Sequence, residues 1–304
     1  MVSHFGDERQ ILTIRFGQYC GSCTCPIFQT DFPPPDTVFF HVTDTDAAAA
    51  ITDPPQVADP NPTAGVTAAM GLRPGRGTAL LQVIVASGVP TQLALGLMLQ
   101  LAGLGAFTLG NPVPLFVAII ALTDSVLLVV LIYAFLVASG ERPRDVLLGD
   151  RPAREMALGL LLLPLLFLGL LMVIGTIAKW FPVLHSVPVN PYETFFHRRS
   201  DALLFALVVV VAGGVREEVQ RGFILRRFHQ RLGGARVGLV IWSCAFGLGH
   251  YTQGWDVAIG MAGAGAFWGW LYLRRGSVLA PIVNHAAFDL AQVVKMALMR
   301  GLSG

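Results

Sequence analysis

Long apolar stretches follow one another through most of this 304-residue chain, and they limit its fold more than any other feature. Hydrophobic residues make up 54% of the chain and charged residues only 13%, with a mean hydropathy of +0.63. Soluble domains carry about 25% charged residues. Backbone polar groups in lipid must be satisfied within the chain, so such stretches form helices. The sequence predicts an all-α, polytopic membrane helical bundle of about seven to eight spans.

The apolar stretches give the expected position of each span to within a few residues. In chain order they are about Ala79–Leu109, Val113–Ser139, Met156–Phe181, Ala202–Ile224, Val237–His250, Val257–Leu273 and Val278–Met299. The first stretch is interrupted near Pro90. The fifth is short, because a spanning helix needs about 20 residues. We therefore expect a broken or partly buried helix there.

Residues 1–75 differ from the rest in composition. They are rich in Pro, Asp, Thr and Ala and have no sustained apolar period. This composition predicts a disordered extension, and residues 1–69 should be dispensable for insertion and activity. A start codon assigned too early, with Met70 as the true start, is the alternative interpretation. We expect N-terminal membrane helices over 76–155 and a membrane core over 156–304.

Basic residues gather in alternate loops, which predicts the orientation of the chain. If the spans alternate, one side holds Arg73, Arg76, Arg142, Arg144, Arg151, Arg154, Arg226, Arg227, Arg231, Arg236, Arg274 and Arg275. The other side holds chiefly Lys179, Arg198, Arg199 and Arg300. The positive-inside rule then places the N-terminus in the cytoplasm. The composition is typical of a bacterial protein, so we expect an integral protein of a bacterial cytoplasmic membrane. The net charge of +2 is too small to predict a nucleic-acid partner.

Two adjacent glutamates, Glu217 and Glu218, lie in the fourth apolar stretch and are followed by Arg221. The apolar part before them, Ala202–Ala212, is too short to cross a bilayer, so the span takes the charged residues into the membrane. On a helix Arg221 lies at i+4 from Glu217 and i+3 from Glu218, so all three can face one way. Ionisable side chains deep in the bilayer are costly in free energy, and they usually mark a functional site. The alternative is a structural ion pair at a helix end near the membrane surface.

Histidines and a further carboxylate fall at a depth similar to that of the glutamates. At 1.5 Å per residue from the cytoplasmic ends of their spans, the glutamates lie about 13 Å deep and His285 about 12 Å. Asp289 lies about 18 Å deep and His250 about 20 Å. All are near the middle of a hydrocarbon core about 30 Å thick. Three spans thus bring polar groups to one depth, and we expect them to surround one cavity.

This set of side chains suits the activation of water. A glutamate can take the proton of a water molecule that attacks a carbonyl carbon. A histidine or a bound divalent metal can stabilise the oxyanion that forms. Asp289 lies one helical turn after His285 and can orient its imidazole. Alternatively, His250, His285 and Asp289 could hold a zinc ion.

Some alternatives remain open at this point. The spacing does not say which glutamate acts as the base; the other carboxylate, held by Arg221, would form a structural ion pair. A lone histidine in a membrane helix, such as His250, can also be an inert hydrogen-bonded residue.

Three short patterns, taken together, resemble those of the CPBP intramembrane proteases. The glutamate pair with Arg221 resembles the pattern E-E-x-x-x-R, Phe246 and His250 match F-x-x-x-H, and His285 and Asp289 match H-x-x-x-N/D. The resemblance covers roughly residues 155–295. The family includes the type II CAAX prenyl endopeptidases and the bacteriocin-processing and immunity proteins.

The resemblance implies an α-helical protease core that hydrolyses peptide bonds. It implies Glu217 as the base that activates water, with His250, His285 and the residue at 289 around it. Position 289 is Asp here, where the prenyl endopeptidases carry Asn. The additional negative charge would favour a metal or a protonated histidine.

Three functions remain in competition. The leading hypothesis is an intramembrane endopeptidase, of metallo- or glutamate type, whose substrate is a prenylated peptide, a bacteriocin leader or another membrane protein. The second is a non-catalytic scaffold or bacteriocin self-immunity protein, which the intact motifs argue against. The third is an ion-coupled transporter, in which carboxylates and histidines near the bilayer midplane are also expected. No internal repeat of the spans is evident, which argues against the transporter.

Overall fold

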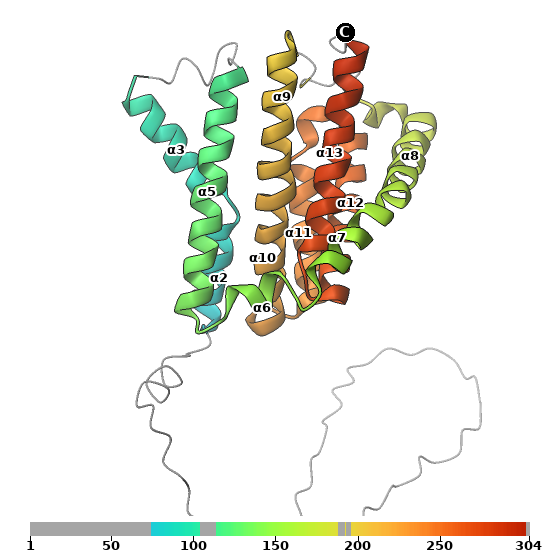
Figure 1. Cartoon of the computed structure of the whole chain (residues 1–304). Helices are drawn as coiled ribbons and strands as arrows, with labels where there is room; N and C mark the ends of the chain where they lie inside the picture. Colours follow the sequence, from blue (N-terminus) through green and yellow to red (C-terminus); the bar gives the residue numbers. More distant parts are fainter. Residues whose placement is uncertain (1–73, 104–113, 188–191, 193–195, 302–304) are drawn as a thin grey trace, which may run out of the picture. The chain divides into compact units, whose positions relative to one another are not determined.

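The structure, a computed structural model, describes residues 74–103, 114–187, 192 and 196–301. Every regular element in these ranges is a helix (Figure 1). The described helices belong to one compact unit, residues 59–304. The expected disordered extension over 1–75 lies almost entirely outside the described residues and stays a prediction.

The first expected span is a pair of helices, α2 (Arg76–Ala86) and α3 (Val89–Leu101), that are bent by 49° relative to each other. Gly88 joins them with φ of +83°, a left-handed conformation that only glycine adopts without strain. Pro90 follows in the first turn of α3, where a missing N–H is tolerated. The interruption expected near Pro90 is therefore present, and glycine and proline together explain it.

The next apolar stretches form α5 (Pro114–Ala138), α6 (Pro143–Leu147), α7 (Pro152–Leu161) and α8 (Leu163–Trp180). The single helix expected over 156–181 is divided between α7 and α8, which meet at Leu162. Pro164 lies in the first turn of α8, and its missing N–H accounts for the break. A short 3₁₀ turn, Pro182–Leu184, follows α8.

One continuous helical stretch contains the glutamate pair. It consists of α9 (Arg199–Val208), a wide π-helical segment η3 (Val209–Arg216) and α10 (Glu217–Arg231). The glutamates therefore form the first two residues of α10, directly after the wide turns. Segments of π-helix are rare and are often found at functional sites.

The C-terminal part contains α11 (Ala235–Leu248), a 3₁₀ turn (Tyr251–Gln253), α12 (Trp255–Arg275) and α13 (Leu279–Met299). Helix α11 has only 14 residues, in agreement with the short fifth stretch. Helices α12 and α13 have 21 residues each. They are about 31 Å long, sufficient to cross the hydrocarbon core.

Two helical stretches, Pro114–Ala138 and Pro143–Trp180, are both long and apolar enough to cross a membrane, and the bent α2–α3 pair makes a third. The remaining long helices carry the polar groups of the candidate site. Large apolar side chains are exposed along the outer helices, as with Leu93, Leu127 and Leu171. The chain is an integral membrane protein with an all-α bundle fold.

Helix α10 lies in the interior of the unit. It contacts α2, α5, α11 and α12, and ten of its residues are buried. Phe223, Ile224 and Leu225 pack with Leu128 and Ile132 of α5 in one apolar cluster. A second cluster lies between α8, α11, α12 and α13. This packing keeps the first turn of α10 away from the lipid-facing surface.

Candidate functional site

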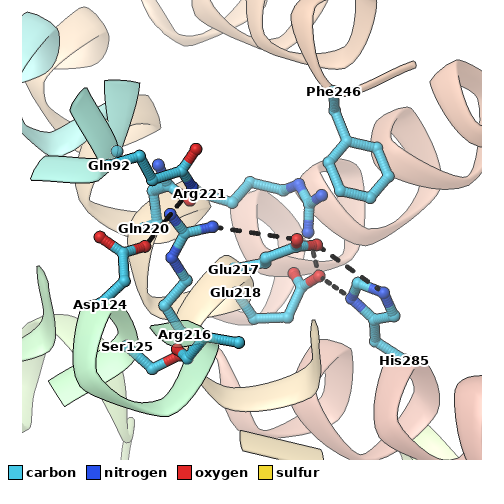
Figure 2. A network of polar contacts seen from close by, with 12 residues as sticks. Gln92, Asp124, Ser125, Arg216, Glu217, Glu218, Gln220, Arg221, Phe246 and His285 are labelled. Carbon is cyan, nitrogen blue, oxygen red and sulfur yellow. Dashed lines mark hydrogen bonds and ion pairs between the residues drawn. The ribbon is translucent and has the colours of Figure 1, made fainter. Parts of the chain in front are cut away.

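The two glutamates at the start of α10 have different environments. The Glu218 side chain is 1% exposed, whereas that of Glu217 is 25% exposed. Figure 2 shows both carboxylates between Arg216, Arg221 and His285. Adjacent residues point about 100° apart around a helix, so the same packing can bury one and leave the other accessible.

Glu218 is held from two sides. Arg221 forms an ion pair with its Oε1 atom, and Nδ1 of His285 lies 2.8 Å from the same oxygen. The guanidinium of Arg221 also stacks near two aromatic rings, 4.6 Å from the centre of Phe246 and 5.4 Å from that of Trp268. These contacts compensate for burying the charges. Glu218 is therefore fully engaged within the protein.

The spacing of the arginine differs from the pattern it resembles. Only two residues separate Glu218 from Arg221, so the chain reads E-E-x-x-R rather than E-E-x-x-x-R. Arg221 pairs with Glu218 at i+3, and among the described residues no ion pair joins it to Glu217. Arg216 and His285 each have a nitrogen 3.9 Å from one of the oxygens of Glu217. Glu217 thus lies beside two basic side chains without a short hydrogen bond to either.

His285 connects the three carboxylates. Because a carboxylate oxygen accepts, Nδ1 of His285 donates to Glu218. Its Nε2 atom lies 3.5 Å from Oδ2 of Asp289 and 3.9 Å from Oε2 of Glu217. Glu217, Glu218, His285 and Asp289 are therefore brought together by α10 and α13, as their common depth predicted. Their catalytic roles stay a prediction.

The imidazole of His285 is fixed by residues that sequence reasoning did not assign to the site. Trp268 of α12 stacks on it, with ring centres 3.8 Å apart and planes at 16°. Nε1 of Trp268 donates to Asn284 at 2.8 Å, and the Asn284 amide donates to the carbonyl of Gly159 at 2.8 Å. Asn284 thus links Trp268 to the backbone of α7. Three helices, α7, α12 and α13, together fix one ring.

His250 lies one helical turn after Phe246 and packs against its ring. Its Nδ1 atom donates to the carbonyl of Phe246, 2.9 Å away. The Phe246 ring centre lies 4.8 Å from that of His250 and 6.0 Å from that of His285. Within the described residues His250 has no ion pair with a carboxylate. Its Nε2 atom is therefore the nitrogen left for a ligand or substrate.

The metal hypothesis for His250, His285 and Asp289 finds no matching geometry. In the described part of the chain, no group of three or more His, Cys, Asp and Glu residues is arranged to hold a metal ion. Nδ1 of His285 is occupied by Glu218, and Nδ1 of His250 by the carbonyl of Phe246. The three residues as placed do not fit a shared metal, and no step below is routed through one.

A second polar group, which the sequence analysis did not single out, adjoins Glu217. Asp124 of α5 accepts from Nη2 of Arg216 at 2.9 Å, from Oγ1 of Thr91 at 2.7 Å and from Nε2 of Gln92 at 3.4 Å. Asp124 is the one charged residue in the sequence of Pro114–Ala138. An ionisable residue within such an apolar stretch is by itself a functional signal. That signal could have identified it.

Tyr192 is a further residue near the carboxylates that the sequence did not indicate. Partial burial raises the pKa of its phenol, and the negative charges of Glu217 and Asp289 raise it further. Its ring packs against Phe205 of α9, with centres 6.1 Å apart. The segment between α8 and α9 therefore contributes a residue close to the site.

Two glycines of η3 allow α13 to come close. A Cβ atom at Gly213 would lie 2.5 Å from Oδ2 of Asp289, and one at Gly214 would lie 2.7 Å from Cβ of Ala286. The wide segment thus presents a surface without side chains to the helix that carries His285. This contact sets the distance between the residues of α10 and those of α13.

The comparison with known families matches this part of the molecule. The family model described as type II CAAX prenyl endopeptidase, Rce1-like, matches residues 199–291. This range runs from α9 into α13 and contains the glutamate pair, both histidines and Asp289. No curated protein and no solved structure matches the chain. This match over residues 199–291 is consistent with the resemblance of the chain to the CPBP intramembrane proteases.

Proposed function

We propose that this protein is an intramembrane endopeptidase in which Glu217 activates the attacking water. The different environments of the two glutamates carry this proposal. Glu218 is bound by Arg221 and His285, so its charge is already neutralised within the protein. Glu217 is partly exposed and has no short hydrogen bond among the described residues. A carboxylate in this state can accept a proton from water.

The proposed reaction is a direct hydrolysis. Glu217 takes one proton of the water molecule while the water oxygen bonds to the peptide carbonyl carbon. Negative charge then develops on the carbonyl oxygen. The C–N bond breaks as this oxyanion collapses, and the protonated Glu217 returns its proton to the departing amine. The products are a carboxylic acid and an amine, and Glu217 is restored; the acid then gives its remaining proton to the amine or to solvent, which leaves a carboxylate.

The neighbouring residues would support this step in different ways. Asp289, 3.5 Å from Nε2 of His285, orients the imidazole beside Glu217. His250, whose Nδ1 is used by the carbonyl of Phe246, offers Nε2, and in its protonated form this nitrogen would donate to the oxyanion. Arg221 holds Glu218 and has a structural role.

The substrate would be a peptide that reaches the membrane interior. The family name points to a prenylated C-terminal peptide; a leader peptide or another membrane protein are the other candidates. The start of α2, α6 and the end of α10 lie at one end of the unit, where most arginines are found (Figure 1). We propose that this end faces the cytoplasm of a bacterial cell.

A cleavage assay in proteoliposomes tests the proposal. The full chain is incubated with two quenched peptides of the same sequence, one farnesylated at a C-terminal cysteine and one not. We expect cleavage of at least one, abolished by Glu217→Ala in a variant that still elutes as a folded protein. No cleavage by the wild-type protein, with ion flux across the vesicles, would favour the transporter. No cleavage and no flux would favour the scaffold or immunity protein.

A further inference from the structure

Asp124 is a carboxylate buried in a helix that is otherwise apolar. Its side chain is 6% exposed, and it accepts from Arg216, Thr91 and Gln92, which lie on two other helical segments. Figure 2 shows Asp124 on the opposite side of Arg216 from Glu217. Burying a carboxylate here without hydrogen-bond partners would be strongly unfavourable, so Asp124 depends on the groups that donate to it.

Arg216 connects Asp124 with the proposed base. Its Nη2 atom donates to Asp124 at 2.9 Å, and its Nη1 atom lies 3.9 Å from Oε1 of Glu217. The guanidinium side chain is 11% exposed. It thus has one firm contact, with Asp124, and one looser contact, with Glu217.

The break between α2 and α3 makes room for this guanidinium. A Cβ atom at Gly88 would lie 2.3 Å from Nη2 of Arg216, so a side chain there would displace the guanidinium from its present position. One turn further along α10, Nε2 of Gln220 donates to the carbonyl of Ala86 at 2.6 Å. The bend in the first span is therefore built around two polar residues that flank the glutamate pair.

Holding α5 against α10 does not require this ion pair. Leu128 and Ile132 of α5 already pack with Phe223 and Ile224 of α10 in a buried apolar cluster. Replacing a buried ion pair by neutral residues of similar size often leaves stability unchanged, so such a pair is weak evidence for a purely structural role. The contact with Glu217 is the feature that the apolar packing does not provide.

We propose that Arg216 is a positioning residue for Glu217, with Asp124 as its anchor. Asp124 fixes the guanidinium, and the guanidinium holds the Glu217 carboxylate in place by its charge. Because the Arg216–Glu217 contact is longer than a hydrogen bond, the Glu217 oxygens stay able to take a proton. The inference rests on the proposed role of Glu217 as the base.

A neutral double variant separates positioning from structure. In Asp124→Asn with Arg216→Gln, both charges are removed together, so no unpaired charge is left in the interior. We expect a thermal midpoint close to that of the wild-type protein, but a kcat for the quenched peptide lower by about 10- to 100-fold, because Glu217 is misplaced. KM should stay within about twofold, because substrate binding is unaffected.

The pair formed by Glu155 and Arg275 provides a matched control. Arg275 donates to both oxygens of Glu155, and the two residues lie on α7 and α12, apart from Glu217. The double variant Glu155→Gln with Arg275→Gln should keep the kcat of the wild-type protein. Arg216→Lys, which keeps the positive charge, should recover part of the kcat lost in Arg216→Gln.

The outcomes distinguish this inference from the proposed function. If the Asp124–Arg216 double variant has the stability and the kcat of the wild-type protein, while Glu217→Ala stays inactive, the positioning role of Arg216 is overturned and the proposed function stands. Activity of Glu217→Ala, or no cleavage by the wild-type protein, would overturn the proposed function. If the double variant fails to fold, Asp124→Asn alone decides, because its amide oxygen still accepts from Thr91. A wild-type kcat in that variant would contradict the inference.

Discussion

At the residue scale, two adjacent glutamates have the same chemistry but different environments. Glu218 points toward Arg221 and His285 and is buried with them, whereas Glu217 stays accessible. Both glutamates are neighbours of Arg221 on a helix, at i+3 and i+4, but Arg221 and Nδ1 of His285 both contact Oε1 of Glu218. Arg221 therefore selects Glu218 and leaves Glu217 available for chemistry.

Arg221→Ala should impair folding more than catalysis. The variant leaves Glu218 buried without its cation, and breaking a buried pair costs about 3–5 kcal/mol. Arg274→Ala is a suitable control, since Arg274 is exposed and contacts only the face of Trp270 among the described contacts. Thermal unfolding in detergent measures both. Equal thermal midpoints for the two variants would show that the Arg221–Glu218 pair is not structural.

Asp289→Asn tests how His285 is held. An asparagine keeps a polar amide beside Nε2 of His285, so we expect partial activity that a chelator leaves unchanged. If Asp289 were instead a metal ligand, the variant would lose bound metal and activity together. Activity with and without chelator, combined with elemental analysis of the purified protein, distinguishes these results.

Several site residues could be predicted from the sequence, and others could not. Glu217, His285 and Asp289 carry charge or an imidazole within apolar stretches, and counting residues along the spans placed them at one depth. Trp268 and Asn284 look like ordinary packing residues in the sequence. Their contact with the His285 ring depends on how α12 and α13 cross, and no local pattern encodes that.

At the element scale, η3 determines how closely α13 approaches the glutamates. Gly214→Ala should destabilise the protein by about 1–3 kcal/mol, because the added methyl group would overlap Ala286 of α13. Gly175→Ala on α8 is the control, since nothing lies within 4 Å of a Cβ atom there. That substitution should be neutral or stabilise by about 0.5–1 kcal/mol. Thermal midpoints measure the difference, and a neutral Gly214→Ala would refute the close contact.

The end of α5 is tied to α10 by charge. Arg226 and Arg227 both bind Glu141, in the loop that follows α5. Partial burial raises the pKa of Glu141, but the hydrogen bonds and charges of Arg227 and Arg226 outweigh it and hold the pKa below its ordinary value of 4.5. A carboxyl group whose pKa is lowered on folding stabilises the protein above the unfolded pKa and loses this effect as the pH falls through the folded pKa.

The stability of the protein should therefore fall in acid through Glu141. Glu141→Gln should lower the thermal midpoint near neutral pH, where the wild-type carboxylate is ionised in both states. The difference between the two proteins should shrink below pH 4.5, the ordinary pKa of the group, as the wild-type protein loses the interaction. Thermal scans of both proteins over this range measure it. A difference that does not change with pH would contradict the expected linkage.

At the scale of the whole molecule, the apolar stretches predicted the class of fold and the approximate position of the helices. They did not predict that residues 156–181 divide into α7 and α8, or that the fourth stretch contains the π-helical segment η3. Hydropathy reports where a segment is apolar, whereas these features depend on where individual hydrogen bonds are interrupted. The extension over 1–75 lies almost entirely outside the described residues.

The assignment of Glu217 as base and Glu218 as structural partner is tested most directly by comparing Glu217→Gln with Glu218→Gln. The measurement is kcat for the quenched peptide and the thermal midpoint of each purified variant. We predict that Glu217→Gln keeps the wild-type midpoint and loses about 10²- to 10⁴-fold in kcat, because water is no longer deprotonated. We predict that Glu218→Gln lowers the midpoint, because Arg221 and His285 lose their carboxylate. A Glu217→Gln variant that cleaves the peptide at the wild-type rate would contradict the assignment.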